Sequence, residues 1–132
     1  MIKQYLYLKH AGAKGRGVFT KQKIDANVIV EESPVIVMSS EDRVNLDKTL
    51  LHDYIFEWGK EKKDQIAIRC CMALGFVPLY NHNYESNCEY FMDFEKETIQ
   101  IKTIRPIRKG EELTINYNGN WNDNKKIWFD AK

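Results

Sequence analysis

Three short segments hold the residues of this chain that could do chemistry: Gly15-Arg16-Gly17, Asn81-His82 and Tyr117. A pair of glycines lets the backbone approach a bound molecule closely, because no side chain fills the space. An asparagine amide can accept a hydrogen bond from an ammonium group and donate one to a carboxylate, and a phenol hydroxyl can orient a reacting group. Each segment alone could be a turn or an edge-strand tyrosine. The residues around each segment therefore decide how it is interpreted.

Longer stretches around these residues match sequence elements of a known family. Residues 15–19 read GRGVF, residues 80–88 read YNHNYESNC, and residues 110–117 read GEELTINY. They resemble, in the same order, the G-x-G-[VIL]-F, N-H-S-x-x-P-N and G-E-E-[IL]-T-[IF]-x-Y elements of the SET-domain lysine methyltransferases. The resemblance spans most of the chain. It implies a mostly β fold of the SET-domain (β-clip) type, with small curved sheets and a C-terminal segment threaded through a loop as a pseudoknot.

The same resemblance implies S-adenosylmethionine as cofactor and a lysine as methyl acceptor. Such a transfer is an in-line displacement, so the protein must align two groups and exclude water more than supply a strong base. Tyr117 is the expected catalytic residue, and Tyr54 is expected to line the lysine channel, where aromatic rings suit an alkylammonium group. The expected cofactor-binding residues are Gly15, Arg16, Gly17, Tyr80, Asn81, His82, Tyr117 and Trp121.

Several of these assignments have alternatives. Tyr54 could be a core residue, and Tyr80 could support the pocket instead of touching the cofactor. His82 is expected to act mainly through its backbone, since no second metal ligand lies at a useful spacing. Trp121, in an otherwise polar tail, could close the adenine pocket by stacking.

The chain departs from the family pattern at several positions. The family cysteine is Tyr84 here, and no C-x-C-x(4)-C follows Tyr117, so the zinc site of many histone methyltransferases is expected to be absent. Ile115 replaces an aromatic residue that influences how many methyl groups are added, and Asn116 replaces an aspartate. The short length and the string at 74–76 (LGF) are most similar to compact stand-alone SET proteins of bacteria and large DNA viruses. Those families include enzymes that act on histones or other basic protein tails.

Length and composition limit the partners. A chain of 132 residues with a hydrophobic fraction of 43% and a net charge of +1 is expected to form one domain, residues 1–132, with an aromatic tail at 119–132 after the core. The balanced charge gives no reason to expect direct nucleic-acid binding, and no apolar run approaches the roughly 20 residues that span a bilayer. The three cysteines are expected to be reduced and buried. We expect a cytoplasmic location, or the host cell or nucleus for a viral or eukaryotic protein, and allow for a homodimer.

The pattern between the motifs predicts many short strands. The first is a strand over 5–10 that leads into a glycine loop at 12–17, followed by two strands within 27–38 that are separated by a kink at Pro34. Two hairpins are expected next, one that pairs 54–58 with 66–72 and one that pairs 89–94 with 98–104. The last strand is expected over 113–117. The split at Pro34 is expected because proline cannot donate a ladder hydrogen bond. A short helix is expected to begin near a cap within Ser39-Ser40-Glu41-Asp42.

Three functions remain open from the sequence. The first is a protein-lysine N-methyltransferase acting on a basic protein tail, histones included. The second is a catalytically weak SET fold that binds S-adenosylmethionine or a peptide without turnover, and the third is a β-clip domain with an assembly role and no cofactor. For the first, we expect an extended basic peptide beside a strand edge, with Glu111, Glu112 or Asp53 available to pair with flanking basic residues. Solvated acidic side chains are the ordinary alternative.

Overall fold

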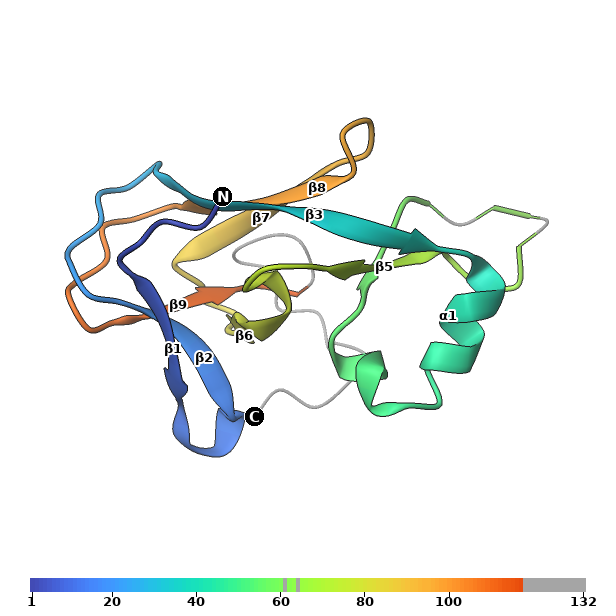
Figure 1. The fold of residues 1–132 in the computed structure, drawn as a ribbon, viewed down its shortest axis with the longest axis horizontal. Helices are drawn as coiled ribbons and strands as arrows, with labels where there is room; N and C mark the ends of the chain where they lie inside the picture. The colour runs from blue at the N-terminus through green and yellow to red at the C-terminus, as the bar shows by residue number, and fades with distance from the viewer. Residues whose placement is uncertain (61, 64, 118–132) are drawn as a thin grey trace.

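The computed structural model describes residues 1–60, 62–63 and 65–117, and this part of the chain is mostly β (Figure 1). Its strands are β1 (Leu6–His10), β2 (Arg16–Thr20), β3 (Ile29–Met38), β4 (Phe56–Glu57), β5 (Cys70–Ala73), β6 (Asn81–His82), β7 (Cys88–Asp93), β8 (Thr98–Thr103) and β9 (Glu112–Ile115). Its helical elements are α1 (Ser40–Leu46) and the 3-10 turns η1 (Gly12–Lys14), η2 (Leu50–Asp53) and η3 (Val77–Leu79).

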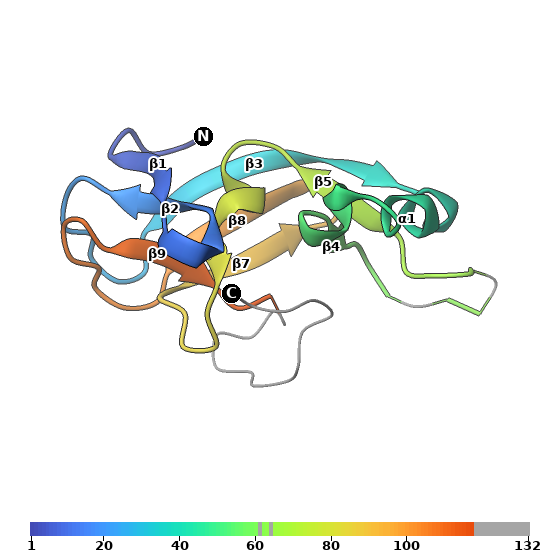
Figure 2. The same cartoon turned by 90° about the horizontal axis from the view of Figure 1, so that it is seen from below.

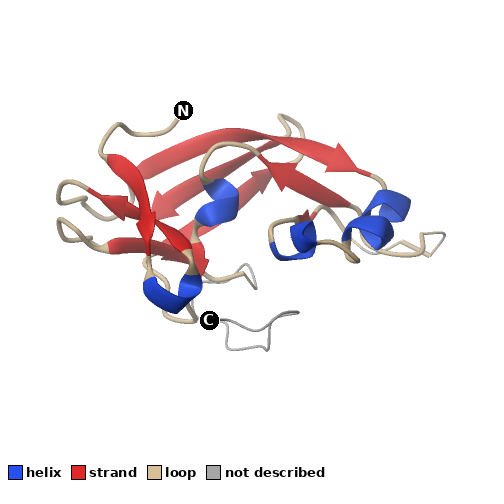
Figure 3. Cartoon of the chain, turned by 60° about the horizontal axis from the view of Figure 1, so that its bottom comes forward, coloured by secondary structure: helices blue, strands red, loops and turns tan. Residues whose placement is uncertain are grey.

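The strands form two sheets. One has the order β1-β2-β9-β6 and the other the order β4-β5-β3-β8-β7. Paired strands are antiparallel except for β6 and β9, which are parallel. Figure 2 shows β3, β8 and β7 side by side, with β1, β2 and β9 toward one end of the molecule and α1 at the other. The helical elements are confined to connections between strands (Figure 3). The predicted mostly β class is confirmed.

Both predicted hairpins form, the first with shorter strands than expected. β4 pairs with β5, with Phe56 opposite Cys71, and β7 pairs with β8 along its full length. Ser39 caps α1 as predicted, since its side-chain oxygen accepts from the backbone N–H of Asp42 at 3.1 Å. All three cysteines are buried and free. No helix among the described residues has the length and apolar run needed to cross a membrane.

The prediction of two short strands around Pro34 was wrong, because β3 runs unbroken for 10 residues. Pro34 lies where β3 changes neighbours. It is opposite Thr98 at the start of β8, and pairing with β5 begins one residue later, with Val35 opposite Ala73. The Pro34 carbonyl accepts from Leu74, one residue past β5. The backbone N–H that proline lacks therefore falls at the end of the pairing between β3 and β5, so its absence removes no hydrogen bond between these strands.

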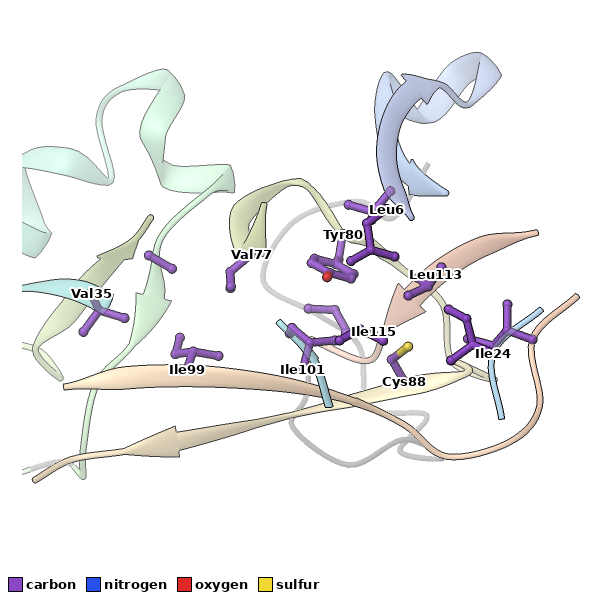
Figure 4. Packing of buried hydrophobic residues seen from close by; sticks show 14 of the residues in the cluster. Leu6, Ile24, Val35, Val77, Tyr80, Cys88, Ile99, Ile101, Leu113 and Ile115 are labelled. Atoms are coloured by element: carbon purple, nitrogen blue, oxygen red, sulfur yellow. The ribbon is translucent and has the colours of Figure 1, made fainter. Parts of the chain in front are cut away.

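Apolar side chains from both sheets join in one core (Figure 4). Its fully buried aliphatic members are Val18, Val30, Val77, Ile99, Ile101, Ile107, Leu113 and Ile115. Tyr80 lies among them, and Figure 4 shows its ring near Leu6, Val77 and Ile115. The core therefore anchors the residue directly before the Asn81-His82 pair.

A carboxylate is buried beside this core. Oε2 of Glu31, on β3, accepts hydrogen bonds from Oγ of Ser33 at 2.7 Å and from the backbone N–H of Phe76 at 2.8 Å. Gly75 closes over this group with a φ of +67°, and a Cβ at this position would collide with both Glu31 Oε2 and Ser33 Oγ. Position 75 therefore requires glycine for its backbone conformation and for the space beside the carboxylate.

Gly75→Ala should destabilise the protein by more than the conformational cost of a positive φ. Gly12→Ala is the matched control, because Gly12 has a φ of +62° and no atom of the described residues lies within 4 Å of the place its Cβ would take. The control should lose about 1–2 kcal/mol, and Gly75→Ala should lose a further 1–3 kcal/mol or so from overpacking against Glu31. Denaturant unfolding of both variants measures the difference. Equal losses would contradict the tight contact.

Candidate active site

The candidate site lies where residues 81–87 run beside β9. β6 and β9 pair in parallel, with Asn81 opposite Thr114 and His82 opposite Ile115. This parallel pairing is a contact between distant parts of the chain. It brings the Asn-His motif against the GEELTINY motif, two segments about thirty residues apart in the chain.

Asn87 holds residues 81–87 against β9, a contact between the two segments that is called the crossing below. Its side chain is buried, Nδ2 donates to the Glu112 carbonyl at 2.8 Å, and Oδ1 accepts from the Thr114 N–H at 2.9 Å. Leaving a buried amide unpaired costs about 1–3 kcal/mol, so this two-ended contact favours one register of the crossing. The sequence analysis matched Asn87 to the family motif without giving it a role.

The crossing holds Tyr117 at both its hydroxyl and its backbone. The hydroxyl donates to the backbone carbonyl of Tyr80 at 2.7 Å, and the Tyr117 N–H donates to Nδ1 of His82 at 3.0 Å. The predicted catalytic tyrosine and the predicted Tyr80-Asn81-His82 segment are therefore in direct contact.

Tyr117 acts as a hydrogen-bond donor in this setting. Burial raises the pKa of its phenol well above the ordinary value, and neighbouring Tyr54, Glu112 and Asp53 raise it further. The hydroxyl therefore stays protonated at neutral pH. It can orient a reacting group, but it cannot serve as a base.

Aromatic rings from other strands line the site beside Tyr117. The Phe56 ring lies edge-on to Tyr117, with centroids 6.4 Å apart, and edge-on to Tyr90 at 5.4 Å. The Tyr90 hydroxyl donates to the Tyr117 carbonyl at 3.3 Å, and burial raises the pKa of Tyr90 to about 12. Tyr54 is partly buried and close enough to affect the titration of Tyr117. The site thus gathers the predicted Tyr54 with two aromatic residues that the sequence analysis did not assign to it.

The sequence contained a signal for only one of these two. Phe56 is the middle residue of the alternating set Tyr54, Phe56 and Trp58, so a channel role for Tyr54 places Phe56 on the same side of a strand. Tyr90 reads as an ordinary hairpin residue. Tyr90 has a place in the site only because β7 pairs with β8 and because its own hydroxyl bonds to Tyr117 just beyond β9.

The glycine segment leads into β2, which pairs with the edge of β9 opposite to β6. Gly15 has a φ of +77°, and no described residue lies within 4 Å of the place its Cβ would take. A Cβ on Gly17 would collide with the Glu112 carboxylate and lie 2.8 Å from Nδ2 of Asn81. The two glycines therefore differ: Gly17 makes room for the protein's own side chains, whereas no described residue fills the space beside Gly15.

The Asn81 side chain is partly committed within the protein. Its Nδ2 donates to Oε2 of Glu112 at 2.7 Å and to the Arg16 carbonyl at 3.2 Å. No described residue donates to its Oδ1. In this conformation only the accepting half of the amide is open, whereas the sequence analysis expected both halves to serve a ligand. Arg16 is exposed and takes part through its backbone.

His82 is a buried, neutral imidazole. Burial lowers its pKa, and the charge of Lys14 lowers it further. Because Nδ1 accepts from the Tyr117 N–H, the ring proton belongs on Nε2. That buried Nε2 has no hydrogen-bond partner among the described residues. A buried donor of this kind marks a place that a water molecule or a ligand atom would complete.

The remaining predicted residues divide between core and tail. The Tyr80 side chain is fully buried, so only its backbone faces the site and it supports the pocket from within. Trp121, with the rest of the 119–132 tail, lies outside the described residues. Within the described part of the chain, no cluster of His, Cys, Asp or Glu side chains could hold a metal ion.

Comparisons with known proteins identify the family. The SET domain matches residues 15–118, a span that contains all three sequence motifs. The chain belongs to the SET-domain family. A Schizosaccharomyces pombe protein named histone-lysine N-methyltransferase, H3 lysine-37 specific, is 30% identical over 131 residues, which cover 98% of this chain and 80% of the relative.

A solved structure from Plasmodium falciparum, assigned as a histone methyltransferase, shares the SET fold. Its TM-score is 0.62 at 22% identity, over 88% of this chain and 99% of that one. The SET fold predicted from the sequence is confirmed, and the chain is a SET-type protein-lysine methyltransferase. S-adenosylmethionine is the methyl donor that this family implies.

The turnover of this SET enzyme should rise with pH, without a fall caused by Tyr117 below about pH 10. A phenol with a raised pKa keeps its proton until the pH passes that raised value, so the donor is present throughout this range. The rise comes from the substrate lysine, whose neutral form attacks the methyl group. The pH profile of kcat/KM checks this expectation. A falling limb below pH 10 in the wild type that disappears in Tyr117→Phe would contradict it.

Proposed function

We propose that this enzyme methylates the ε-amine of a lysine in a basic protein tail, with histone tails as the first candidates, and uses S-adenosylmethionine bound between the glycine segment and the Asn81-His82 pair. The observation that carries the proposal is the position of the Tyr117 hydroxyl. It is held in its protonated form on the Tyr80 carbonyl, beside the aromatic rings of Phe56 and Tyr90. The histone activity in the name of the Schizosaccharomyces pombe relative supports the choice of substrate class.

The residues around the glycine segment fit an adenosyl amino acid. No described residue fills the space beside Gly15, Asn81 Oδ1 can accept from an ammonium group, and His82 Nε2 is a buried donor without a described partner. When bound, S-adenosylmethionine supplies a methyl group on a positively charged sulfur. His82 would then contribute its ring as well as the backbone contact expected from the sequence.

The chain's own groups would orient the acceptor and exclude water. The Tyr117 hydroxyl donates to the Tyr80 carbonyl and is fixed there, so it presents a constant dipole to the reacting centre. The Phe56 and Tyr90 rings beside it suit an alkyl stem and attract an alkylammonium through their faces. The site needs no internal base, provided that the amine arrives in its neutral form.

Two of the three acidic residues expected to pair with a basic substrate already have partners within the protein. Glu112 accepts from Asn81, and Oε1 of Glu111 accepts from the Arg108 N–H at 2.9 Å. Asp53 is exposed at the end of η2, next to Tyr54. We therefore propose Asp53 as the residue that faces basic side chains flanking the target lysine. A homodimer and the cellular location remain predictions from sequence.

Tyr117→Phe should lower methyl transfer at least tenfold while S-adenosylmethionine affinity stays near the wild-type value. Tenfold corresponds to about 1.4 kcal/mol of transition-state stabilisation, and the loss follows from removing the fixed hydroxyl dipole that faces the reacting groups. Radiolabelled methyl transfer to mixed core histones measures turnover, and calorimetric titration measures affinity. Tyr7→Phe on β1 is the control, because it makes the same chemical change on a ring that packs on Phe19 rather than on Phe56 or His82.

The outcomes separate the possible functions. Near-normal turnover in Tyr117→Phe would remove Tyr117 from the mechanism. A wild-type protein that binds S-adenosylmethionine but methylates neither histones nor any protein in a cell lysate would favour the catalytically weak binding module. Methylation of acidic folded proteins in preference to histones would overturn the basic-tail substrate and leave the cofactor assignment in place.

A further inference from the structure

Glu31 is a carboxylate in the protein interior that the site described so far does not explain. It is fully buried on β3, and none of the ion pairs among the described residues includes it. Burial raises its pKa, and the hydrogen bonds it accepts oppose that rise. Placing an acid in a core without a cation is costly unless its oxygens are hydrogen-bonded, so the destination of those bonds is informative.

The two oxygens of Glu31 hold both ends of the η3 turn. Oε2 accepts from the backbone N–H of Phe76, just before the turn, at 2.8 Å. Oε1 accepts from the hydroxyl of Tyr80, just after the turn, at 2.9 Å. Ser33, from the same strand as Glu31, completes the set by donating to Oε2. One carboxylate therefore fixes residues 76–80 against β3.

This turn ends at the carbonyl that holds Tyr117. Tyr80 gives its side-chain hydroxyl to Glu31 and accepts the Tyr117 hydroxyl on its backbone oxygen, at 2.9 Å and 2.7 Å respectively. A single residue thus links the buried acid to the tyrosine of the site. Hydrogen bonds weaken steeply with distance and angle, so a small shift of Tyr80 would release the Tyr117 hydroxyl.

We propose that Glu31 is a positioning residue for methyl transfer, which anchors Tyr80 so that its carbonyl keeps the Tyr117 hydroxyl in place. This inference rests on the role proposed above for Tyr117. Glu31 contacts none of the reacting groups, and it acts on turnover only through Tyr80. An apolar side chain of similar size could fill the space, but it could not accept from Phe76 and Tyr80 together.

Glu31→Gln tests the inference while keeping the size of the side chain. Gln has one accepting oxygen, so its amide nitrogen must face either Tyr80 or the Ser33 and Phe76 donors. We expect kcat on core histones to fall about three- to tenfold, with KM and S-adenosylmethionine affinity within about twofold of wild type. An unchanged kcat would overturn the proposal.

A double variant separates positioning from general damage to the fold. Tyr117→Phe has no hydroxyl to hold, so adding Glu31→Gln to it should lower kcat no further. The same fold-loss in both backgrounds would overturn the proposal. Thr103→Val is the control, because it removes buried hydrogen bonds to the Asp25 carbonyl and from the Val28 N–H without touching Tyr80. The control should lower the unfolding temperature and leave kcat unchanged.

Crystal structures of wild type and Glu31→Gln give a readout that needs no substrate. The variant should lengthen or break the contact between the Tyr117 hydroxyl and the Tyr80 carbonyl, which is 2.7 Å in the native protein. An unchanged contact would overturn the proposal, whichever proteins the enzyme methylates. A Tyr117→Phe enzyme with normal turnover would overturn the role of Tyr117 and, with it, that of Glu31.

Discussion

The hydrogen bonds between residues 81–87 and β9 are the constraint on which the site depends. Parallel pairing of β6 with β9 sets the two segments side by side, and Asn87 bonds to two backbone groups of β9. Only Asn116 lies between the end of β9 and Tyr117, so the register of this crossing decides where the ring and hydroxyl of Tyr117 lie. The other features of the site, including the neutral His82 ring and the rings of Phe56 and Tyr90, take their positions relative to that register.

Buried polar groups, more than apolar packing, give the site its geometry. The core fixes the position of the Tyr80 ring, but the direction of the Tyr80 carbonyl depends on the hydrogen bonds of the segment around it. Glu31, Asn87 and His82 are all buried, and each bonds to a backbone or side-chain group that belongs to a different element. Polar contacts in a low-dielectric interior are directional and costly to break. Such contacts suit a reaction that needs alignment more than acid–base power.

The sequence predicted the parts of the site that short motifs encode. Gly15-Arg16-Gly17, Asn81-His82 and Tyr117 were found from the resemblance of their segments to the SET-domain motifs, and the structure brings Asn81 and His82 against β9 and Tyr117. The hairpins followed from alternation and turn residues. The reason for Gly17 was different from the expected one, since its space is taken by the side chains of Glu112 and Asn81.

What the sequence could not supply were contacts between elements that are distant in the chain. The unbroken β3 depends on Pro34 falling at the exchange between two partner strands, which no local pattern reveals. Glu31 reads as one of two adjacent acids on an ordinary strand, and only the fold shows that it is the buried one. The site role of Tyr90 likewise depends on strand pairing rather than on spacing.

A crystal structure of the protein with S-adenosylhomocysteine tests the central claim most directly, because it shows where the cofactor binds relative to the crossing. The account predicts the amino-acid end of the ligand beside Gly15 and Oδ1 of Asn81, and an acceptor atom of the ligand or a bridging water on Nε2 of His82. It also predicts that the Tyr117 hydroxyl keeps its bond to the Tyr80 carbonyl. The result that would contradict this prediction is a ligand bound elsewhere, for example near Phe91 and Phe94 on the β7–β8 hairpin, with no ligand beside Gly15, Asn81 and His82.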